Sequence, residues 1–516
     1  MLNYLLRDKG ALTLTVVFFV AGLWLVSYHE MWRDELQAWL LARDSSSVIV
    51  LFENLKYEGH PGLWHLLLMP LTRIFQSPVS MQYLNLVIAA ASVYLLARHS
   101  PFTWLQKVLI AFGYYFFYEY GIIARNYAIG VLLVFLYCAI FQSRRKQPLA
   151  IATTLFLLAH TSVLGLIIAF ALFSGLIIEE YLTRSESERT SGHKIREWFG
   201  ILIVMFGFVS AVVQLKPPAD SGYATAWTFH YSYEQIVATL GALVDACFPL
   251  PKIEVAYWKG KLPIGGVFSD FVAPIIALGV FFAFARSLFG RPSAAFIYIC
   301  STIGLLAFFY TKYMGYWRHH GFVFVALIAA LWIAPSCNEY ASTWFNRKPP
   351  ALSDIALDRL FVFILLVHVA GVAIAAYQDY KYPFSGAKDA ARFIREHELE
   401  KLEIIGDCSP QASAVAGYLS PRLFYYPDAA RYGSFVRWDN KISVAKQSEL
   451  LNKAAEIAMH QPEGILLVLN YPIESSDARH VNLNLLYISE SPFVGDEKFY
   501  IYRFKAGTVG LPGREN

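Results

Sequence analysis

Long apolar runs separated by short polar connections dominate the chain from residue 11 to about residue 377. The first run, Ala11 to Val26, follows Arg7 and Lys9. Ten further runs are each close to the ~20 residues that a helix needs to cross a bilayer. They fall near residues 79–97, 104–120, 127–142, 149–162, 163–181, 198–214, 271–289, 294–311, 320–335 and 359–377. The pattern predicts a polytopic α-helical membrane protein with about 11 transmembrane helices.

Two apolar segments need a separate interpretation. The first run has the charge pattern of a signal peptide, but no small-x-small cleavage site follows it, so we expect a retained transmembrane helix. The segment 63–75 is only about 13 residues long and contains Pro70 and Arg73. It predicts a helix that lies against the membrane surface.

Basic residues recur in every second connection between the predicted spans. Under the positive-inside rule these connections face the cytoplasm. They contain Arg98, Lys107, Arg144, Arg145, Lys146, Arg184, Arg189, Lys194, Arg196, Arg286, Arg291, Arg347, Lys348 and Arg359. The N-terminus is then cytoplasmic, and the first loop (29–78), the loop 215–270 and the tail from Gln378 onward lie outside.

The tail, residues 378–516, has a different pattern. Strand-like runs at Leu402–Gly406, Ile465–Leu469 and Phe499–Phe504 alternate with helical patterns at 386–398, 409–419 and 444–459. We therefore expect a C-terminal extracytoplasmic α/β domain after a transmembrane domain that comprises residues 1–377. Such a domain either packs as a cap over the membrane part or helps to hold an acceptor.

Composition agrees with a membrane protein. Apolar residues make up 56% of the 516 positions and charged residues only 16%, whereas a soluble protein carries about a quarter charged residues. The net charge of +4 is spread over loops and gives no reason to expect nucleic-acid binding. The five cysteines show no paired spacing, which argues against a zinc ribbon or a disulfide framework.

Charged residues beside the first span are the strongest functional signal, because charges at a bilayer boundary are costly. Met31 to Trp39 contains Asp34 and Glu35 between tryptophans at helical spacing, which predicts an amphipathic interfacial helix. Neighbouring residues on a helix point about 100° apart, so Asp34 and Glu35 do not both face one cavity. The competing interpretation is a solvated helix whose acids are surface charges.

Glu58 and His60 form a second polar pair, in a turn that continues with Pro61. Carboxylate oxygen and imidazole nitrogen are ligands that suit Mg²⁺, Mn²⁺ or Zn²⁺, so this pair is a candidate for a divalent metal ion. Two residues do not define a metal site. A turn with a hydrogen-bonded histidine explains them equally well.

Further polar clusters fall on the same predicted outer side. Arg125 suits a planar phosphate clamp, although an ion pair with Glu119 is the structural alternative. Another group, Arg318-His319-His320, favours an anionic ligand, and snorkelling to lipid headgroups competes with this interpretation. His160 ends an apolar helix and is either a substrate-pocket residue or a polar packing residue.

These residues resemble the GT-C superfamily of integral-membrane glycosyltransferases, most closely the family 39-type enzymes. That group includes protein O-mannosyltransferases and the bacterial transferase that adds aminoarabinose to lipid A. The resemblance lies in Asp34-Glu35 after the first span, in Glu58, His60, Pro61 and Leu63, and in Arg125-Asn126-Tyr127. It covers roughly residues 1–215. Gly62 replaces a proline of the family motif, and Gly59 separates Glu58 from His60, so the sequence departs from the family pattern at these two positions.

The resemblance implies a polyprenyl-phosphate sugar as the donor and a bacterial-type plasma membrane as the location. Asp34 would then act as general base on an acceptor hydroxyl, with inversion at the sugar carbon. Glu35 is the second candidate catalytic residue. Arg125 and Tyr127, with Arg318, His319 and His320, would bind the donor phosphate. No nucleotide cofactor is expected, and the acceptor could be a glycan, a lipid or a protein. The loop 215–270 would help to select it.

Three other classes of protein stay open. A glycan ligase or polymerase would transfer a lipid-linked oligosaccharide in place of one sugar. A secondary transporter would show inverted repeats and polar residues near the middle of the membrane, which this sequence lacks. A membrane scaffold without catalytic activity would tolerate the loss of Asp34, Arg125 and Arg318 together.

Overall fold

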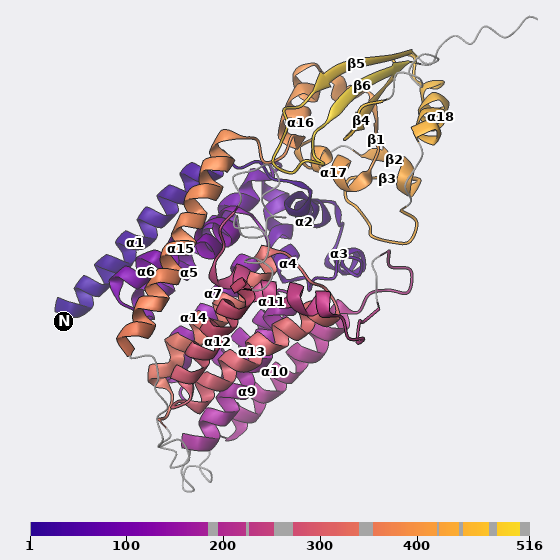
Figure 1. Ribbon diagram of the computed structural model, residues 1–516. Coiled ribbons are helices and arrows are strands. Elements are labelled where there is room, and N and C mark those ends of the chain that lie inside the picture. The colour runs from indigo at the N-terminus through magenta and orange to yellow at the C-terminus, as the bar shows by residue number, and fades with distance from the viewer. Residues whose placement is uncertain are drawn as a thin grey trace, which may run out of the picture.

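The computed structural model describes residues 2–183, 194–222, 226–251, 272–339, 354–419, 423–442, 447–473 and 482–505. These residues form an elongated bundle of helices with a small mixed sheet at one end (Figure 1). Parts of the predicted loop 215–270 fall outside the described residues. So do four predicted basic-loop residues, Arg184, Arg189, Arg347 and Lys348.

Seven helices of the described chain are long and apolar enough to cross a membrane. They are α1 (Leu2–Val26), α5 (Val79–His99), α9 (Val163–Thr183), α10 (Lys194–Leu215), α13 (Pro292–Thr311), α14 (Trp317–Ile333) and α15 (Asp354–Lys381). Four shorter apolar helices are α4 (Leu63–Ile74), α7 (Tyr127–Ile140), α8 (Pro148–Ala159) and α12 (Ala273–Leu288). The chain is therefore a mostly helical protein with several helices able to span a membrane, as the sequence predicts.

Local sequence signals explain where some helices begin. Pro148 and Pro292 open α8 and α13, a position where a missing N–H costs no hydrogen bond. Thr103 caps α6 (Trp104–Ala111) by a reciprocal arrangement. Its hydroxyl accepts from the Gln106 N–H at 3.3 Å, and its own N–H donates to the Gln106 side chain at 2.9 Å.

Polar contacts show which helix ends meet. At one end of the bundle, Asp8 of α1 pairs with Arg98 at the end of α5. At the other end, His29, just after α1, contacts Asp379 near the end of α15 at 2.8 Å. The His29 carbonyl also accepts from Gln82 of α5 at 3.2 Å. Helices α1 and α15 therefore run in the same direction, and α5 runs opposite to them.

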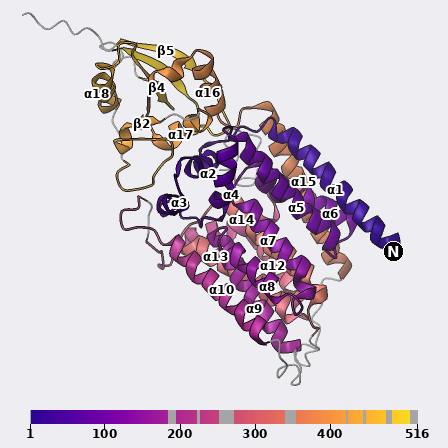
Figure 2. The ribbon, with the colours of Figure 1, turned by 180° about the vertical axis from the view of Figure 1, so that it is seen from behind.

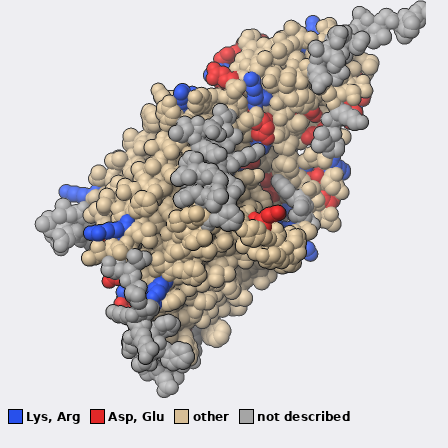
Figure 3. Space-filling model, in the orientation of Figure 1, with Lys and Arg blue, Asp and Glu red and all other residues tan. Residues whose placement is uncertain are grey.

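The two ends of the bundle carry different sets of charged residues. We call the first the basic end, because it carries Arg98, Arg144, Arg145 and Arg291, and the second the Asp34 end. Figure 3 shows Lys and Arg at the end of the helical body away from the sheet, and few charged residues along its middle. Residues of both signs gather between the helical body and the sheet (Figure 3).

The span predicted at 104–120 is not one continuous α-helix. After α6 the chain forms a π-helical segment, η1 (Tyr115–Ile122), whose residues are all buried. Glu119 lies inside this segment, and the Tyr114 hydroxyl donates to it at 2.9 Å. Irregular helical turns of this kind are frequent at functional sites. Here η1 leads directly into the segment that carries Arg125.

The first loop folds into α2 (Arg33–Asp44), α3 (Val48–Leu55) and α4. A helix at 31–42 is therefore confirmed, but its surroundings differ from those expected of a half-solvated interfacial helix. Every residue from Glu35 to Arg43 is buried. The reason is that the C-terminal part of the chain covers the face of α2 that the sequence alone leaves open. A further helix, α11 (Tyr233–Cys247), lies in the loop 215–270, where none was predicted.

The C-terminal unit, residues 387–505, contains a six-stranded sheet. Its strands are β1 (Glu403–Gly406), β2 (Phe424–Tyr426), β3 (Arg431–Gly433), β4 (Ile465–Leu469), β5 (Asn482–Ile488) and β6 (Tyr500–Lys505), in the order β3-β2-β1-β4-β6-β5. Only β1 is parallel to both neighbours. The helices of the C-terminal unit are α16 (Ala387–Glu396), α17 (Ser409–Tyr418) and α18 (Gln447–Ala458).

All three strands and three helices predicted in the tail are present. The strands β2, β3 and β5 were missed. With three residues each, β2 and β3 are too short to show an alternating pattern.

Helix α17 docks the C-terminal unit on α2, as both ribbon views show (Figures 1 and 2). Gly417 allows the close approach, because a Cβ atom there would lie 3.0 Å from the Leu36 side chain. The Tyr418 hydroxyl donates to the Met31 carbonyl at 3.3 Å. The helix that carries Asp34 is therefore packed between the helical body and the C-terminal unit.

Candidate functional site

Asp34 lies at the centre of the charged residues at the Asp34 end. Its Oδ2 atom is 2.8 Å from Arg125 Nη1 and 3.0 Å from Arg318 Nη2. The Asp34 side chain is 28% exposed, and both guanidinium groups are mostly buried. The structure thus joins Asp34, Arg125 and Arg318, three predicted site residues far apart in the sequence.

Three helix N-termini meet at this ion-pair cluster. Asp34 is in the first turn of α2, Arg125 lies just before α7, and Arg318 is the second residue of α14. A helix N-terminus carries partial positive charge, so an arginine there adds to the existing positive potential and an anion relieves it. The arrangement therefore favours negative charge, which Asp34 supplies in this structure.

The protonation of Asp34 follows from its neighbours. Burial by itself raises the pKa of a carboxyl group, but Arg125, Arg318 and Arg33 outweigh it and lower the pKa of Asp34 to about 2. Burial opposes the charge on Arg125 too, but Asp34 holds the pKa of the guanidinium above its usual value. Asp34 is ionised at neutral pH and is a weak base while both arginines contact it.

Aromatic rings surround the two guanidinium groups. Arg318 lies 5.4 Å from the ring centre of Trp32 and 5.2 Å from that of Tyr316, and Arg125 lies 5.8 Å from that of Tyr127. Such cation–π contacts hold a guanidinium in place and use none of its N–H donors. No described residue accepts a hydrogen bond from the buried Nε–H of Arg318. The Nε–H of Arg318 can therefore donate a hydrogen bond to a further anion.

His319 and Tyr127 form one hydrogen-bonded unit. His319 Nδ1 accepts from the Tyr316 N–H at 2.9 Å, so in the neutral ring Nε2 carries the proton. Nε2 then donates to the Tyr127 hydroxyl at 3.0 Å. The phenol keeps its own proton for another acceptor. Both residues belong to the predicted phosphate-binding set, and the structure brings them together beside Arg125.

His320 points to a different partner from the one expected. Its ring is 2.8 Å from Asp245 Oδ2 and 2.9 Å from the Met314 carbonyl, so acceptors face both nitrogens. Asp245 lies on α11, and sequence reasoning missed it because no helix was predicted there. The pair links α11 to α14 and has no direct contact with Asp34 among the described hydrogen bonds and ion pairs.

Glu35 points into the protein, away from the two arginines that contact Asp34. Its Oε1 atom accepts from the Ala124 N–H at 2.7 Å, and Oε2 is 3.1 Å from His29 Nε2. The other ring nitrogen of His29 contacts Asp379 at 2.8 Å, and all three side chains are fully buried. Burial opposes the charge on His29, but Asp379 and Glu35 together raise its pKa to about 10. Sequence reasoning missed His29 and Asp379.

Glu58 and His60 lie beside the ion-pair cluster. The Gln37 carboxamide donates to Glu58 Oε1 at 2.7 Å, and His60 Nδ1 is 2.7 Å from the Glu58 carbonyl, which leaves Nε2 with its lone pair. Burial raises the pKa of Glu58 to about 7, and burial together with Arg125 lowers that of His60 to about 4. Both residues are near enough to Asp34 and Arg125 to feel their charges.

The predicted metal site offers two candidate ligands in this structure, Glu58 and His60. Among the described residues, no three His, Cys, Asp or Glu side chains gather into a metal-binding group. Glu58 and His60 supply one oxygen and one nitrogen, fewer donor atoms than a Mg²⁺ or Zn²⁺ site takes from its surroundings. A divalent ion at this pair stays a prediction.

Among the described hydrogen bonds, the His160 side chain contacts none of Asp34, Arg125 and Arg318. Its ring contacts the Phe156 carbonyl at 2.8 Å and the Ser210 hydroxyl at 3.0 Å. These contacts join the end of α8 to α10, which fits the alternative of a polar packing residue.

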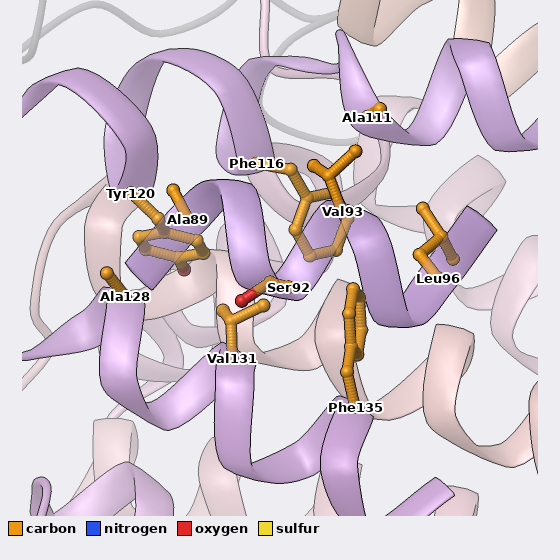
Figure 4. A pocket seen from close by; sticks show the side chains of 10 residues that line it. All are labelled: Ala89, Ser92, Val93, Leu96, Ala111, Phe116, Tyr120, Ala128, Val131 and Phe135. Carbon is orange, nitrogen blue, oxygen red and sulfur yellow. The ribbon is translucent and has the colours of Figure 1, made fainter. Parts of the chain in front are cut away.

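Two cavities of the described chain are apolar. One lies between α5, η1 and α7 and is lined by Phe116, Tyr120 and Phe135, among others (Figure 4). Its volume of about 10 Å³ is roughly the least that can hold one water molecule. A groove of about 410 Å³ runs along α13 past Ile299, Ile303 and Gly304. Neither contains the polar groups of the ion-pair cluster.

Comparison with known proteins adds no relative to this description. No protein-family model matches the sequence, and no curated protein matches it either. The contacts within the chain itself therefore carry the functional interpretation.

Proposed function

We propose that this protein is an integral-membrane glycosyltransferase of the GT-C type. It would transfer a sugar from a polyprenyl-phosphate donor to an acceptor hydroxyl at the outer face of the membrane. The observation that carries the proposal is the Asp34 carboxylate held between Arg125 and Arg318. The Asp34 carboxylate can take up a proton, and the guanidinium groups of Arg125 and Arg318 can hold a phosphate. The proposed transfer requires both.

The donor phosphate would replace Asp34 as the partner of the two arginines. A phosphate offers several acceptor oxygens, and the planar guanidinium group binds such an anion well. The Nε–H of Arg318 and the Tyr127 hydroxyl would add further donors. Once the arginines contact phosphate, less positive charge acts on Asp34, so its pKa rises from about 2 and it becomes a better base.

Transfer would then proceed in one displacement. The acceptor hydroxyl gives its proton to Asp34 while its oxygen attacks the anomeric carbon. The bond between that carbon and the phosphate oxygen breaks, the configuration inverts, and polyprenyl phosphate leaves with the bonding electron pair. A positioned base contributes about 10²–10⁴-fold to such a reaction. Arg125 and Arg318 would stabilise the charge on the leaving phosphate.

The arrangement of the helices supports the predicted topology. Helices α7, α8 and α12 and the α6–η1 segment fit between the seven long helices with alternating direction, which agrees with about 11 crossings. The arginines of the basic end would face the cytoplasm under the positive-inside rule. The Asp34 end and the C-terminal unit would then lie outside.

A lipid-linked donor also fits the surface of α13. The groove past Ile299, Ile303 and Gly304 is apolar, as a prenyl chain requires. Helix α13 ends at Thr311, six residues before α14 begins with Trp317 and Arg318. A chain in the groove would therefore lead toward the arginines.

Mass spectrometry of copurified lipids tests the proposal. Wild-type protein and Asp34→Asn are purified under gentle extraction from the same membranes. We expect the intact polyprenyl-phosphate sugar on Asp34→Asn and free polyprenyl phosphate on wild type. No prenyl lipid on either protein would contradict the proposal.

A further inference from the structure

Two pairs of neighbouring residues face each other across the site. Asp34 and Glu35 lie in the first turn of α2, and Ala124 and Arg125 lie in the link between η1 and α7. Asp34 contacts Arg125 at 2.8 Å, and Glu35 accepts from the Ala124 N–H at 2.7 Å. The two contacts are therefore parallel cross-links between the same two stretches of chain. One is partly exposed and the other is fully buried.

We propose that Glu35 is a positioning residue that sets the distance between Asp34 and Arg125. It would act by fixing the backbone of Ala124 to the first turn of α2. This inference rests on the proposed function, because the distance that it controls matters only if Arg125 binds the donor phosphate and Asp34 takes the acceptor proton.

The surroundings of Glu35 explain how it keeps one position. Its second oxygen lies 3.1 Å from His29 Nε2 and accepts from the Trp32 N–H at 3.4 Å. The His29 ring also packs against Phe384, with ring centres 4.5 Å apart. Because the carboxylate is fully buried and bound on both oxygens, moving it would leave charged groups without partners in the protein interior.

Other contacts hold the two ends of the link that carries Arg125. The Ile123 N–H donates to the Tyr118 carbonyl at 3.3 Å, and the Asn126 side chain donates to the Thr161 carbonyl at 2.6 Å. Between them, Glu35 fixes the backbone of Ala124. Residues 123–126 link η1 to α7 and lie in no regular helix. When the phosphate replaces Asp34, the ion pair between Asp34 and Arg125 is lost, and only the buried cross-link still joins the two segments. A misplacement of about 1 Å in a reacting group can cost about 10²-fold in rate.

A matched pair of variants separates positioning from general stability. Glu35→Ala and Asp379→Ala each remove one of the two carboxylates of His29, so both should lower thermal stability. Only Glu35→Ala frees the Ala124 N–H. Glu35→Gln keeps an oxygen for that N–H and is the conservative variant, with Asp379→Asn as its counterpart.

The first measurement is amide hydrogen exchange of a peptide that covers residues 121–127, which needs neither donor nor acceptor. We expect faster exchange in Glu35→Ala only. The second is transfer with the donor found on the wild-type protein. We expect kcat to fall by about 10²-fold in Glu35→Ala, to stay within about threefold in Asp379→Ala at a similar loss of stability, and to recover in Glu35→Gln.

Equal exchange rates in the two alanine variants would overturn the proposal, whatever lipid the protein carries. Faster exchange in Glu35→Ala with kcat no lower than in Asp379→Ala would overturn it as well. If wild type carries no prenyl lipid, the proposed function fails, and the exchange data still decide whether Glu35 fixes residue 124.

Discussion

Asp34 and Glu179 are carboxylates at opposite ends of the helical body, and the protein holds them in different ways. Glu179 is 1% exposed. Its Oε1 atom accepts from Arg144 at 3.2 Å and from the Asn338 N–H at 3.0 Å, and its Oε2 atom accepts from Ser293 at 2.7 Å. Both oxygens have protein partners, and the group joins three stretches of chain. This is a saturated structural contact.

The Asp34 contact is not saturated. Both arginines approach the same oxygen, and the side chain is 28% exposed. Arg318 retains a buried N–H without an acceptor among the described residues. Positive charge is thus in excess at three helix N-termini, which costs stability unless an anion binds. At the basic end Arg291 also has a buried Nε–H without an acceptor among the described residues. The two ends therefore differ in the carboxylate, because Asp34 is partly exposed and binds two arginines through one oxygen, whereas Glu179 is buried and has partners on both oxygens.

We expect Asp34 and Glu179 to differ most in their effect on the rate of transfer. Asp34→Asn should lower transfer by about 10²–10⁴-fold, because the amide cannot accept the acceptor proton. Glu179→Gln should leave transfer within about twofold, since Glu179 lies at the basic end. Initial rates with the copurified donor measure both. Equal losses in the two variants would show that the ends do not differ in function.

Binding of the lipid part of the sugar donor should depend on the arginines of the Asp34 end and not on those of the basic end. Arg125→Gln removes a charged hydrogen-bond donor, and such bonds contribute about 1.5–3 kcal/mol. We therefore expect about 10–100-fold weaker binding of polyprenyl phosphate. Arg145→Gln at the basic end is the matched control and should bind as wild type. Native mass spectrometry at several lipid concentrations gives both affinities, and similar weakening in the two variants would refute the assignment of Arg125.

For thermal stability we expect the reverse, with a larger loss when Glu179 is removed than when Asp34 is removed. Glu179→Ala leaves the Ser293 hydroxyl and the Asn338 N–H without their acceptor, at about 1–3 kcal/mol for each buried donor. Asp34→Ala also leaves Arg125 and Arg318 without a carboxylate, but it should cost less, because the Asp34 position is 28% exposed and water can solvate the two guanidinium groups there. Thermal unfolding in one detergent compares the two. A larger loss for Asp34→Ala would mean that Asp34 is mainly structural.

The smallest expected effect is a shift in pH dependence. Arg318→Gln removes one of the cations that hold the pKa of Asp34 at about 2. That pKa should rise by about 1–3 units, the usual influence of one adjacent opposite charge. The base is then lost to protonation at a higher pH, so the acid limb of kcat/KM moves upward. An unchanged limb in Arg318→Gln, with Arg145→Gln as control, would exclude Asp34 as the titrating base.

Much of the difference between the two ends can be predicted from the sequence, because apolar runs and the charges at their ends are local signals. Apolar runs locate most of the helices, and the charges that interrupt their ends identify Asp34, Arg125 and Arg318. The direction of the Glu35 side chain could not be predicted. Helical geometry separates it from Asp34 by about 100°, but it does not say which of the two faces the interior.

Long-range and backbone contacts were also beyond prediction. His29 and Asp379 are 350 positions apart, and nothing in either neighbourhood signals the other. The Gln37 carboxamide binds the Val436 backbone through both its oxygen and its nitrogen, at 3.0 Å and 2.6 Å. Any residue at position 436 offers the same carbonyl, so no side-chain pattern reveals this contact. A C-terminal domain that packs as a cap was one of the two interpretations of the sequence, but contact of this unit with α2 was not predicted.

The most direct test of the central claim is a cryo-electron microscopy map of Asp34→Asn purified with polyprenyl phosphate. We expect phosphate density within hydrogen-bond distance of both Arg125 and Arg318, and a prenyl chain that leads toward α13. Phosphate bound at the arginines of the basic end, with Arg125 and Arg318 in contact only with protein, would contradict the account.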